Sequence, residues 1–154
     1  MIRKKRGYTL LEILMVMGII GILLAVSASA FLSARLTARD ARRKTDLEQI
    51  RGAIETYKAD KNVYPGSQSV PTQSSGNVSS LATFLVSGSN QYISAIPSDP
   101  ISTMQYYYIP TATGYYLCAS LEGLPNTAST NCGSGDCGVS SNLAKVCNYE
   151  VKNP

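Results

Sequence analysis

The residue whose chemistry is most unusual for its surroundings is Glu12. Four basic residues, Arg3–Arg6, and then Gly7 precede it, and no charged residue follows from Ile13 to Ala34. A charged side chain at the centre of a bilayer costs about 2.5–3.5 kcal/mol. In a low dielectric a lone charge is costly and a paired one is tolerated, so Glu12 is expected to pair with a cation. The alternative is an interfacial carboxylate that reaches the lipid headgroups.

Four cysteines form the second set of chemically capable residues, and all lie in the last quarter of the chain: Cys118, Cys132, Cys137 and Cys147. An even number in a Gly/Ser-rich region beyond a membrane-length segment predicts two disulfides in an oxidising compartment. Zinc is the alternative, but the C-x4-C spacing differs from the usual C-x2-C pair. Three pairings are possible. We favour Cys118 with Cys147 across neighbouring strands, and Cys132 with Cys137 closing a small loop.

Composition argues against several other functions. The chain has no histidine, and we find no Gly-rich phosphate loop, nucleophile elbow or paired carboxylates, so an enzyme is not predicted. Arg3–Arg6 account for the whole net charge of +4, because the other ten basic residues match the ten acidic ones. The leader therefore orients a membrane segment, and the charge is no sign of nucleic-acid binding.

A long helix must carry Glu12. Ile13–Ala34 has 22 uncharged residues, which at a rise of 1.5 Å cover roughly 33 Å and can span a bilayer. The helical pattern continues from Arg35 to about Lys61 without a proline. The apolar residues of this second half recur at helical spacing and are expected to pack on a sheet: Leu47, Ile50, Ile54 and Tyr57.

Charged residues cover the rest of this second half. Opposite charges four positions apart predict pairs on the solvent side: Asp40 with Lys44, Arg42 with Asp46, and Arg51 with Glu55. The basic residues Arg39, Arg42, Arg43 and Lys44 could grip anionic lipid or pair between subunits, but a solvated helix face is favoured.

The remaining chain predicts a small, loop-rich β region. Residues 62–80 are expected to be a loop and Leu81–Val86 a short helix. Gln105–Ile109 and Gly114–Leu121 are rich in tyrosine and apolar residues and predict a β-hairpin, with Asn142–Val151 as a last strand. Alternate tyrosines of the hairpin should pack on the helix, and the others should face outward. The fold class is therefore α+β, with the β-rich region at 100–154.

The opening motif resembles a known processing signal. Lys5-Arg6-Gly7-Tyr8-Thr9-Leu10-Leu11-Glu12 resembles the class III signal of type IV pilins and type II secretion pseudopilins. The resemblance implies cleavage after Gly7 by a prepilin peptidase and methylation of the new amino terminus at Tyr8. It also implies that Glu12 supports subunit docking. Glycine suits a cleavage site because it lets a protease approach the backbone closely.

A second match lies at the helix end. Asp46-Leu47, Ile50, Ala53-Ile54-Glu55, Tyr57, Asp60, Tyr64-Pro65 and the turn Ile96–Pro100 are similar to the major pseudopilin of type II secretion. The resemblance implies a pilin-like subunit with a leader at 1–7, a transmembrane segment at 8–34 and a head at 35–154. The amino terminus would be cytoplasmic and the head periplasmic or extracellular, in a homo-oligomeric helical filament anchored in the bacterial inner membrane. Its partners would be prepilin peptidase, an inner-membrane assembly platform, minor pilins or pseudopilins, and membrane lipid.

The chain departs from that family at three points. Tyr8 stands where phenylalanine is usual, and Ser29 stands where many members have a proline. The calcium loop expected near the end lacks an acidic cluster, since Asp136 is alone, so no metal or other cofactor is predicted. The helix-end match favours a secretion pseudopilus, whereas the cysteines favour a pilus.

One alternative of another class remains open. Ala25–Ala30 contains small-x-small sites, so ordinary signal peptidase could release a soluble, disulfide-containing binding domain. Against this, the apolar core of a signal peptide rarely carries a glutamate such as Glu12.

Overall fold

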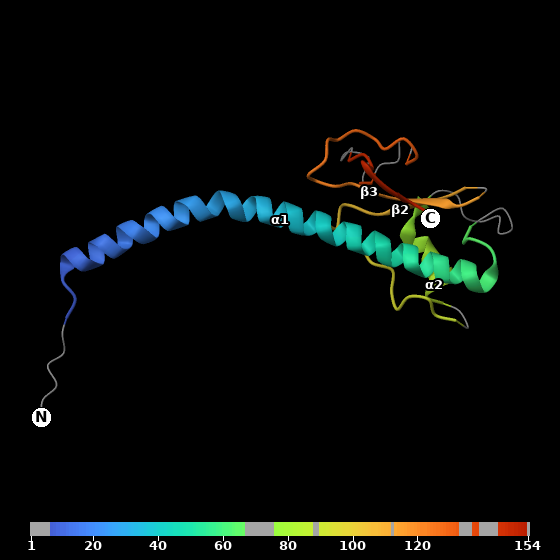
Figure 1. Cartoon of the computed structure of the whole chain (residues 1–154), viewed down its shortest axis with the longest axis horizontal. Coiled ribbons are helices and arrows are strands. Elements are labelled where there is room, and N and C mark those ends of the chain that lie inside the picture. The colour runs from blue at the N-terminus through green and yellow to red at the C-terminus, as the bar shows by residue number, and fades with distance from the viewer. Residues whose placement is uncertain are drawn as a thin grey trace, which may run out of the picture. The chain divides into compact units, whose positions relative to one another are not determined.

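The computed structural model describes residues 7–66, 76–87, 90–111, 113–132, 137–138 and 145–153. Helix α1 spans Leu10–Lys61 and is 52 residues long. After it come β1 (Gly76–Asn77), the 3-10 helix η1 (Val78–Leu81), α2 (Ala82–Leu85), β2 (Tyr107–Pro110), β3 (Tyr115–Ala119) and β4 (Tyr149–Lys152) (Figure 1). The predicted α+β, pilin-like class, with a long amino-terminal helix and a small antiparallel sheet, is confirmed.

The chain divides into two compact units, Met1–Leu36 and Thr37–Pro154. The described part of the first unit is mainly the amino-terminal half of α1, whose large apolar side chains are exposed, from Leu10 at 82% to Leu36 at 41%. Within the described residues, α1 is one helix that is long and apolar enough to cross a membrane, and none of its most apolar window is buried. Residues 1–6 of the predicted leader at 1–7 lie outside the described residues.

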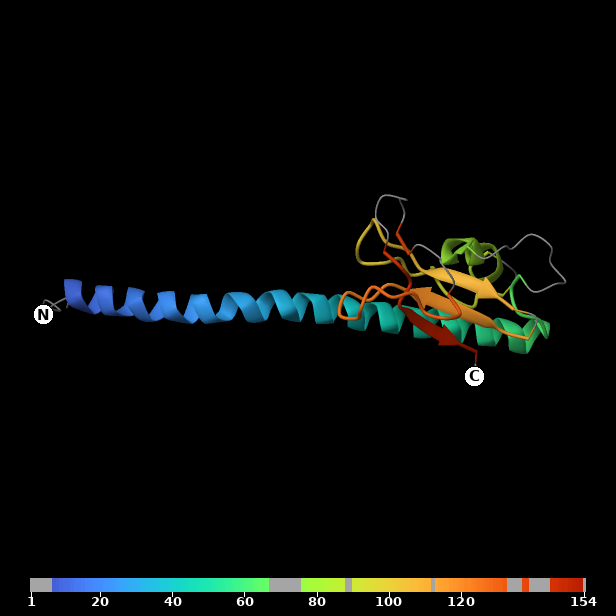
Figure 2. The same cartoon turned by 90° about the horizontal axis from the view of Figure 1, so that it is seen from above.

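The second unit, which we call the head, is built on a four-stranded antiparallel sheet. Its strand order is β1-β2-β3-β4, with Tyr108 opposite Leu117 and Leu117 opposite Val151. Figure 2 shows β2, β3 and β4 as neighbouring arrows beside the carboxy-terminal half of α1. The carboxy-terminal half of α1 shares one core with this sheet, and Leu47, Ile50 and Ile54 are fully buried in it. The predicted apolar stripe is therefore confirmed. Tyr57 completes it as a partly buried residue.

Hydrogen bonds from tyrosine hydroxyls join the sheet to α1 and to the segment that follows it. Tyr106, Tyr108 and Tyr115 are buried, and their hydroxyls donate hydrogen bonds to Asp46 (2.8 Å), the Pro65 carbonyl (2.6 Å) and Glu55 (2.7 Å), in that order. Each bond satisfies a polar group that would be costly to bury alone. Tyr107 and Tyr116 instead pack against the four cysteines in a separate cluster. The predicted alternation of the tyrosines is thus confirmed.

Helix α1 ends at a residue suited to a reversal of the chain. Asn62 has a φ of 59°, in the left-handed region that asparagine tolerates better than most residues. Its backbone N–H donates to Lys58 O at 2.8 Å, and Lys58 Nζ in turn donates to Asn62 O at 2.5 Å.

Two of the sequence-based boundaries change. The predicted loop at 62–80 is wrong at its end, because β1 and η1 occupy Gly76–Leu81. Asn77 explains the change: it pairs with Tyr107 across the sheet, and its Oδ1 accepts the Ser79 N–H at 2.8 Å to cap η1. The hairpin and the short helix are confirmed as β2–β3 and α2, and the last strand is shorter than predicted. Residues 67–75 and 142–144 of these predictions lie outside the described residues.

Candidate functional site

The segment Gly7–Thr9 lies immediately before α1 and is not helical. Thr9 begins the helix: its Oγ1 accepts the Glu12 N–H at 3.3 Å, and its carbonyl accepts the Ile13 N–H at 3.3 Å. This is a side-chain cap at a helix start. The bond between Gly7 and Tyr8 therefore lies outside the helical hydrogen-bond ladder.

Gly7 is not required by the fold. A Cβ built on Gly7 meets no atom within 4 Å. Tyr8, which follows it, is 79% exposed. Any need for glycine at this position therefore comes from outside the described structure.

Glu12 occupies the first turn of α1, one turn beyond Tyr8. A carboxylate there interacts favourably with the positive end of the helix dipole. Side chains around it, including Leu11 and Ile13, are exposed and apolar. The structure thus brings Gly7, Tyr8 and Glu12 together at one end of α1, and the described residues supply no ion pair to the Glu12 carboxylate.

The head holds a buried charge cluster that sequence analysis missed. Arg43 is fully buried, and its guanidinium binds Asp99 through Nε (2.7 Å) and Nη2 (3.1 Å). Its Nη1 donates to Asp40 and Glu122, both at 2.8 Å. Arg39 donates two hydrogen bonds, of 2.7 and 2.6 Å, to the same Glu122 carboxylate. We call these five residues the Arg43 cluster.

This cluster corrects two predictions. A solvated basic face is wrong for Arg43, although it holds for Arg42, whose side chain is 65% exposed. Of the three expected i,i+4 pairs, the described residues contain only the one between Arg42 and Asp46, at 3.9 Å. Asp40 binds Arg43, and Arg51 pairs with Glu48 at 3.4 Å. Helix spacing alone could not rank these partners, because Asp99 and Glu122 come from distant segments.

The electrostatics of the cluster favour its charged form. Burial by itself would lower the pKa of Arg43, but its hydrogen bonds to Asp99 and Glu122 outweigh burial and raise that pKa. The hydrogen bonds from Arg39, and then those from Arg43, lower the pKa of Glu122 from 4.5 to about 2. Arg43 and Glu122 therefore stay ionised at neutral pH, and charge-assisted bonds join them in a closed network.

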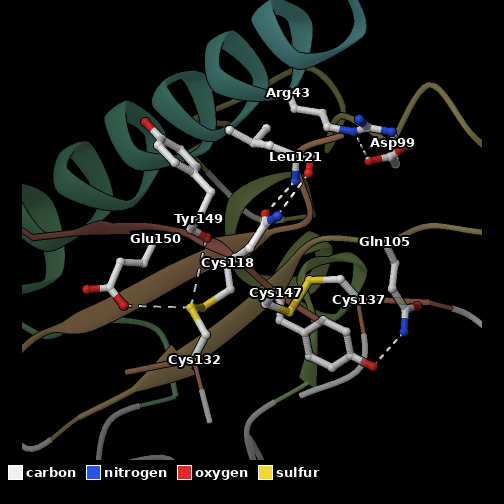
Figure 3. Close-up of a disulfide and its surroundings, with 12 residues drawn as sticks. Arg43, Asp99, Gln105, Cys118, Leu121, Cys132, Cys137, Cys147, Tyr149 and Glu150 are labelled. Atoms are coloured by element: carbon white, nitrogen blue, oxygen red, sulfur yellow. Dashed lines mark hydrogen bonds and ion pairs between the residues drawn. A yellow bond between two sulfur atoms is a disulfide. The ribbon is translucent and has the colours of Figure 1, made fainter. Parts of the chain in front are cut away.

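The four cysteines form two disulfides, as predicted, but the favoured pairing is wrong. The bonds join Cys118 to Cys132 and Cys137 to Cys147 (Figure 3). The strand register explains the error: Glu150 lies opposite Cys118, so Cys147 falls three positions away from it. Cys137 instead lies beside the segment that leads to Cys147, because its N–H donates to Lys145 O at 2.9 Å.

The structure offers no support for a metal in its described part, where no three or more Cys, Asp or Glu side chains are placed to hold one. Asp136 lies outside the described residues. The absence of a metal therefore stays a prediction.

Comparison with known proteins bears on the amino-terminal segment. Residues 2–28 match the family model described as the prokaryotic N-terminal methylation motif. The motif lies on a chain with an exposed apolar helix half and an α+β head, which together give a pilin-like fold, in agreement with the resemblance seen in the sequence. No solved structure gives a significant match to the chain.

The relatives of the chain come from one secretion system. The chain is similar to the type II secretion system core protein G of Vibrio cholerae, with 36% identity over 63 residues, covering 41% of this chain and 43% of the relative. It is also similar to the protein of the same name from Pseudomonas aeruginosa, with 28% identity over 123 residues, covering 77% of this chain and 84% of the relative. The first match thus spans less than half of that relative's length. The chain thus carries the methylation motif and is similar to two proteins named type II secretion system core protein G.

Proposed function

We propose that this chain is a structural subunit of a type IV-like filament, and that the filament is a type II secretion pseudopilus rather than a pilus. One observation carries the proposal above the others. The amino-terminal half of α1 presents apolar side chains to its surroundings, with a single carboxylate at its head and the methylation motif around it. Both relatives named core protein G favour the secretion branch.

In this proposal α1 anchors the subunit in a bacterial inner membrane with its amino terminus in the cytoplasm. Arg3–Arg6 give the orientation expected from the positive-inside rule. The head lies on the opposite side, where an oxidising compartment maintains the two disulfides. Its partners are further copies of the chain, minor pseudopilins, an assembly platform, membrane lipid and prepilin peptidase.

Processing prepares the docking site. Cleavage after Gly7 removes four positive charges and leaves a new amine on Tyr8, which is then methylated. The Glu12 carboxylate of an incoming subunit pairs with the amine of a neighbour inside the apolar bundle. Because each charge is costly there without its partner, the pair fixes the axial position of one subunit against the next.

Intact-mass and amino-terminal mass spectrometry of the membrane-extracted chain test the processing step. The expected product lacks Met1–Gly7 and carries one methyl group on Tyr8. A chain that lacks about 28–30 residues instead would establish ordinary signal-peptide cleavage and a soluble secreted domain.

Glu12→Ala tests the assembly step. The variant should insert and be cleaved normally, because Thr9 still starts the helix, yet filaments should be absent when sheared fractions are examined by electron microscopy. Glu48→Ala is the matched control, since Glu48 is an exposed acid (53%) on the head half of the same helix. Normal filaments from the Glu12 variant would disprove the docking role.

A further inference from the structure

The segment Ser120–Cys132, here called the strap, leaves the end of β3 and returns to it through a disulfide. The bond from Cys132 to Cys118 of β3 joins residues 14 positions apart. Both cysteines are buried, at 2% and 0% exposure. A reductant can therefore reach this bond only when the strap opens.

Polar contacts with the last part of the chain hold the strap on one side. The Asn148 amide accepts the Leu121 N–H at 2.7 Å and donates to Leu121 O at 2.9 Å and to Pro125 O at 3.0 Å. Asn148 follows Cys147, which the second disulfide fixes. Further along, the Glu150 carboxylate accepts hydrogen bonds from Ser129 and, at 2.8 Å, from Asn131.

Polar contacts with α1 hold the strap on the other side. The Asp40 carboxylate accepts the backbone N–H groups of Glu122 (2.9 Å) and Gly123 (2.8 Å). The Glu122 side chain enters the Arg43 cluster and binds Arg39 and Arg43. Figure 3 draws Leu121 of the strap in the same view as Arg43 and the two disulfides.

Leu121 and Cys132 are buried near the two ends of the strap, at 4% and 2% exposure, but its middle has little apolar burial to keep it closed. Residues 123–128 are all exposed, and Leu124 is 44% exposed. Segments with few buried apolar contacts open locally at low free energy unless other bonds constrain them. The strap is therefore kept closed by the disulfide, by the hydrogen bonds with Asn148 and Glu150, and by the ionic contacts with α1.

We propose that the Cys118–Cys132 disulfide controls whether the strap stays bound to α1. We call this arrangement the clasp. With Cys118 bonded to Cys132, it holds the Glu122 carboxylate between Arg39 and Arg43 and completes the Arg43 cluster. With the disulfide reduced, the strap opens and Arg43 keeps only Asp40 and Asp99. The clasp lies wholly within the folded head, so it operates whether or not the chain forms filaments.

The disulfide and the ionic contacts of Glu122 must affect each other reciprocally, so the proposal can be tested on the oxidised, folded protein. If the disulfide favours the ionic contacts, then the ionic contacts must protect the disulfide by the same factor. Reduction uses dithiothreitol: its two thiols supply two electrons and two protons, the two cysteine sulfurs become thiols, and the reagent becomes a cyclic disulfide. Alkylation followed by peptide mass spectrometry gives the reduction rate of each bond.

Glu122→Gln in the full chain, in detergent micelles, removes the charge and keeps the side-chain shape. We expect the Cys118–Cys132 bond to be reduced at least about fivefold faster, because opening of the strap no longer breaks the charge-assisted bonds of Glu122. The Cys137–Cys147 bond should change less. Glu48→Gln, on the exposed face of α1, should leave both rates unchanged.

A core variant distinguishes local opening from general loss of stability. Ile54→Val lies in the helix–sheet core, and its urea midpoint is compared with that of Glu122→Gln. If the two variants have similar urea midpoints, faster reduction of the Cys118–Cys132 bond in Glu122→Gln alone supports the clasp. Unchanged rates, or equal acceleration of both bonds or in both variants, would overturn it.

Discussion

Replacing Arg43 by methionine tests whether the Arg43 cluster stabilises the head. A methionine side chain has an unbranched stem but no donor, so the four hydrogen bonds from Arg43 to Asp40, Asp99 and Glu122 cannot form. Asp99, with a side chain only 1% exposed, would keep the Ile101 N–H at 2.8 Å as its described donor. Removing one partner of a buried ion pair costs about 3–5 kcal/mol, because the other charge stays buried without compensation.

That cost is large beside the total stability of a small domain, about 5–15 kcal/mol. Urea unfolding of the head in the full chain measures the loss in the free energy of unfolding. The near-ultraviolet circular dichroism of its tyrosines reports the transition. Arg42→Met is the matched control one position away. Its side chain is 65% exposed and its ion pair with Asp46 is long, at 3.9 Å, so it should lose at most about 1 kcal/mol.

A second substitution tests the cause. In Arg43→Met/Asp99→Asn the uncompensated carboxylate becomes a neutral amide, so part of the free energy of unfolding should return. Two results would count against a buried, uncompensated charge as the cause. One is an Arg43→Met variant as stable as Arg42→Met, and the other is a double variant less stable than Arg43→Met alone.

Two further predictions concern pH. Because Arg39 and then Arg43 lower the pKa of Glu122 from 4.5 to about 2, its contribution should be complete above pH 4.5 and lost as the pH falls toward 2. Glu122→Gln should flatten this acid limb in urea midpoints, and an unchanged limb would refute the assignment. Burial, and then the bond to Glu55, raises the pKa of Tyr115, so stability should fall as the pH rises above 10. Tyr115→Phe should reduce that alkaline loss, and a loss equal to that of the wild type would contradict the role given to the phenol.

Local patterns sufficed to predict the long helix and the hairpin, but not every element of the fold. The helical spacing of Leu47, Ile50 and Ile54 predicts a buried face, and the tyrosine-rich runs predict a hairpin, because each signal is contained in a few turns or one strand pair. Two residues, Gly76 and Asn77, are too few to show a strand period. Their pairing depends on β2, which no local pattern reveals.

The long-range chemistry of the head could not be predicted in the same way. Arg43 is buried because Asp99 and Glu122, 56 and 79 residues away, supply its counter-charges. The number of cysteines predicts two disulfides, but their pairing follows from the register that sets Glu150 opposite Cys118. The amino-terminal motif was predictable because all its parts lie in eight consecutive residues, Lys5–Glu12.

The apolar half of α1 has a consequence for how such helices can be oriented about their own axes. Large apolar side chains, such as Leu11, Leu14 and Met17, are exposed along this half of the helix. No single apolar face therefore sets how the helix is rotated about its axis. Between Tyr8 and Ala34 the only ionisable side chain besides the phenol of Tyr8 is Glu12. In the filament proposed above, such a helix has no other feature to fix its rotation in hydrocarbon, so the pairing of Glu12 would set both its height and its orientation about its own axis.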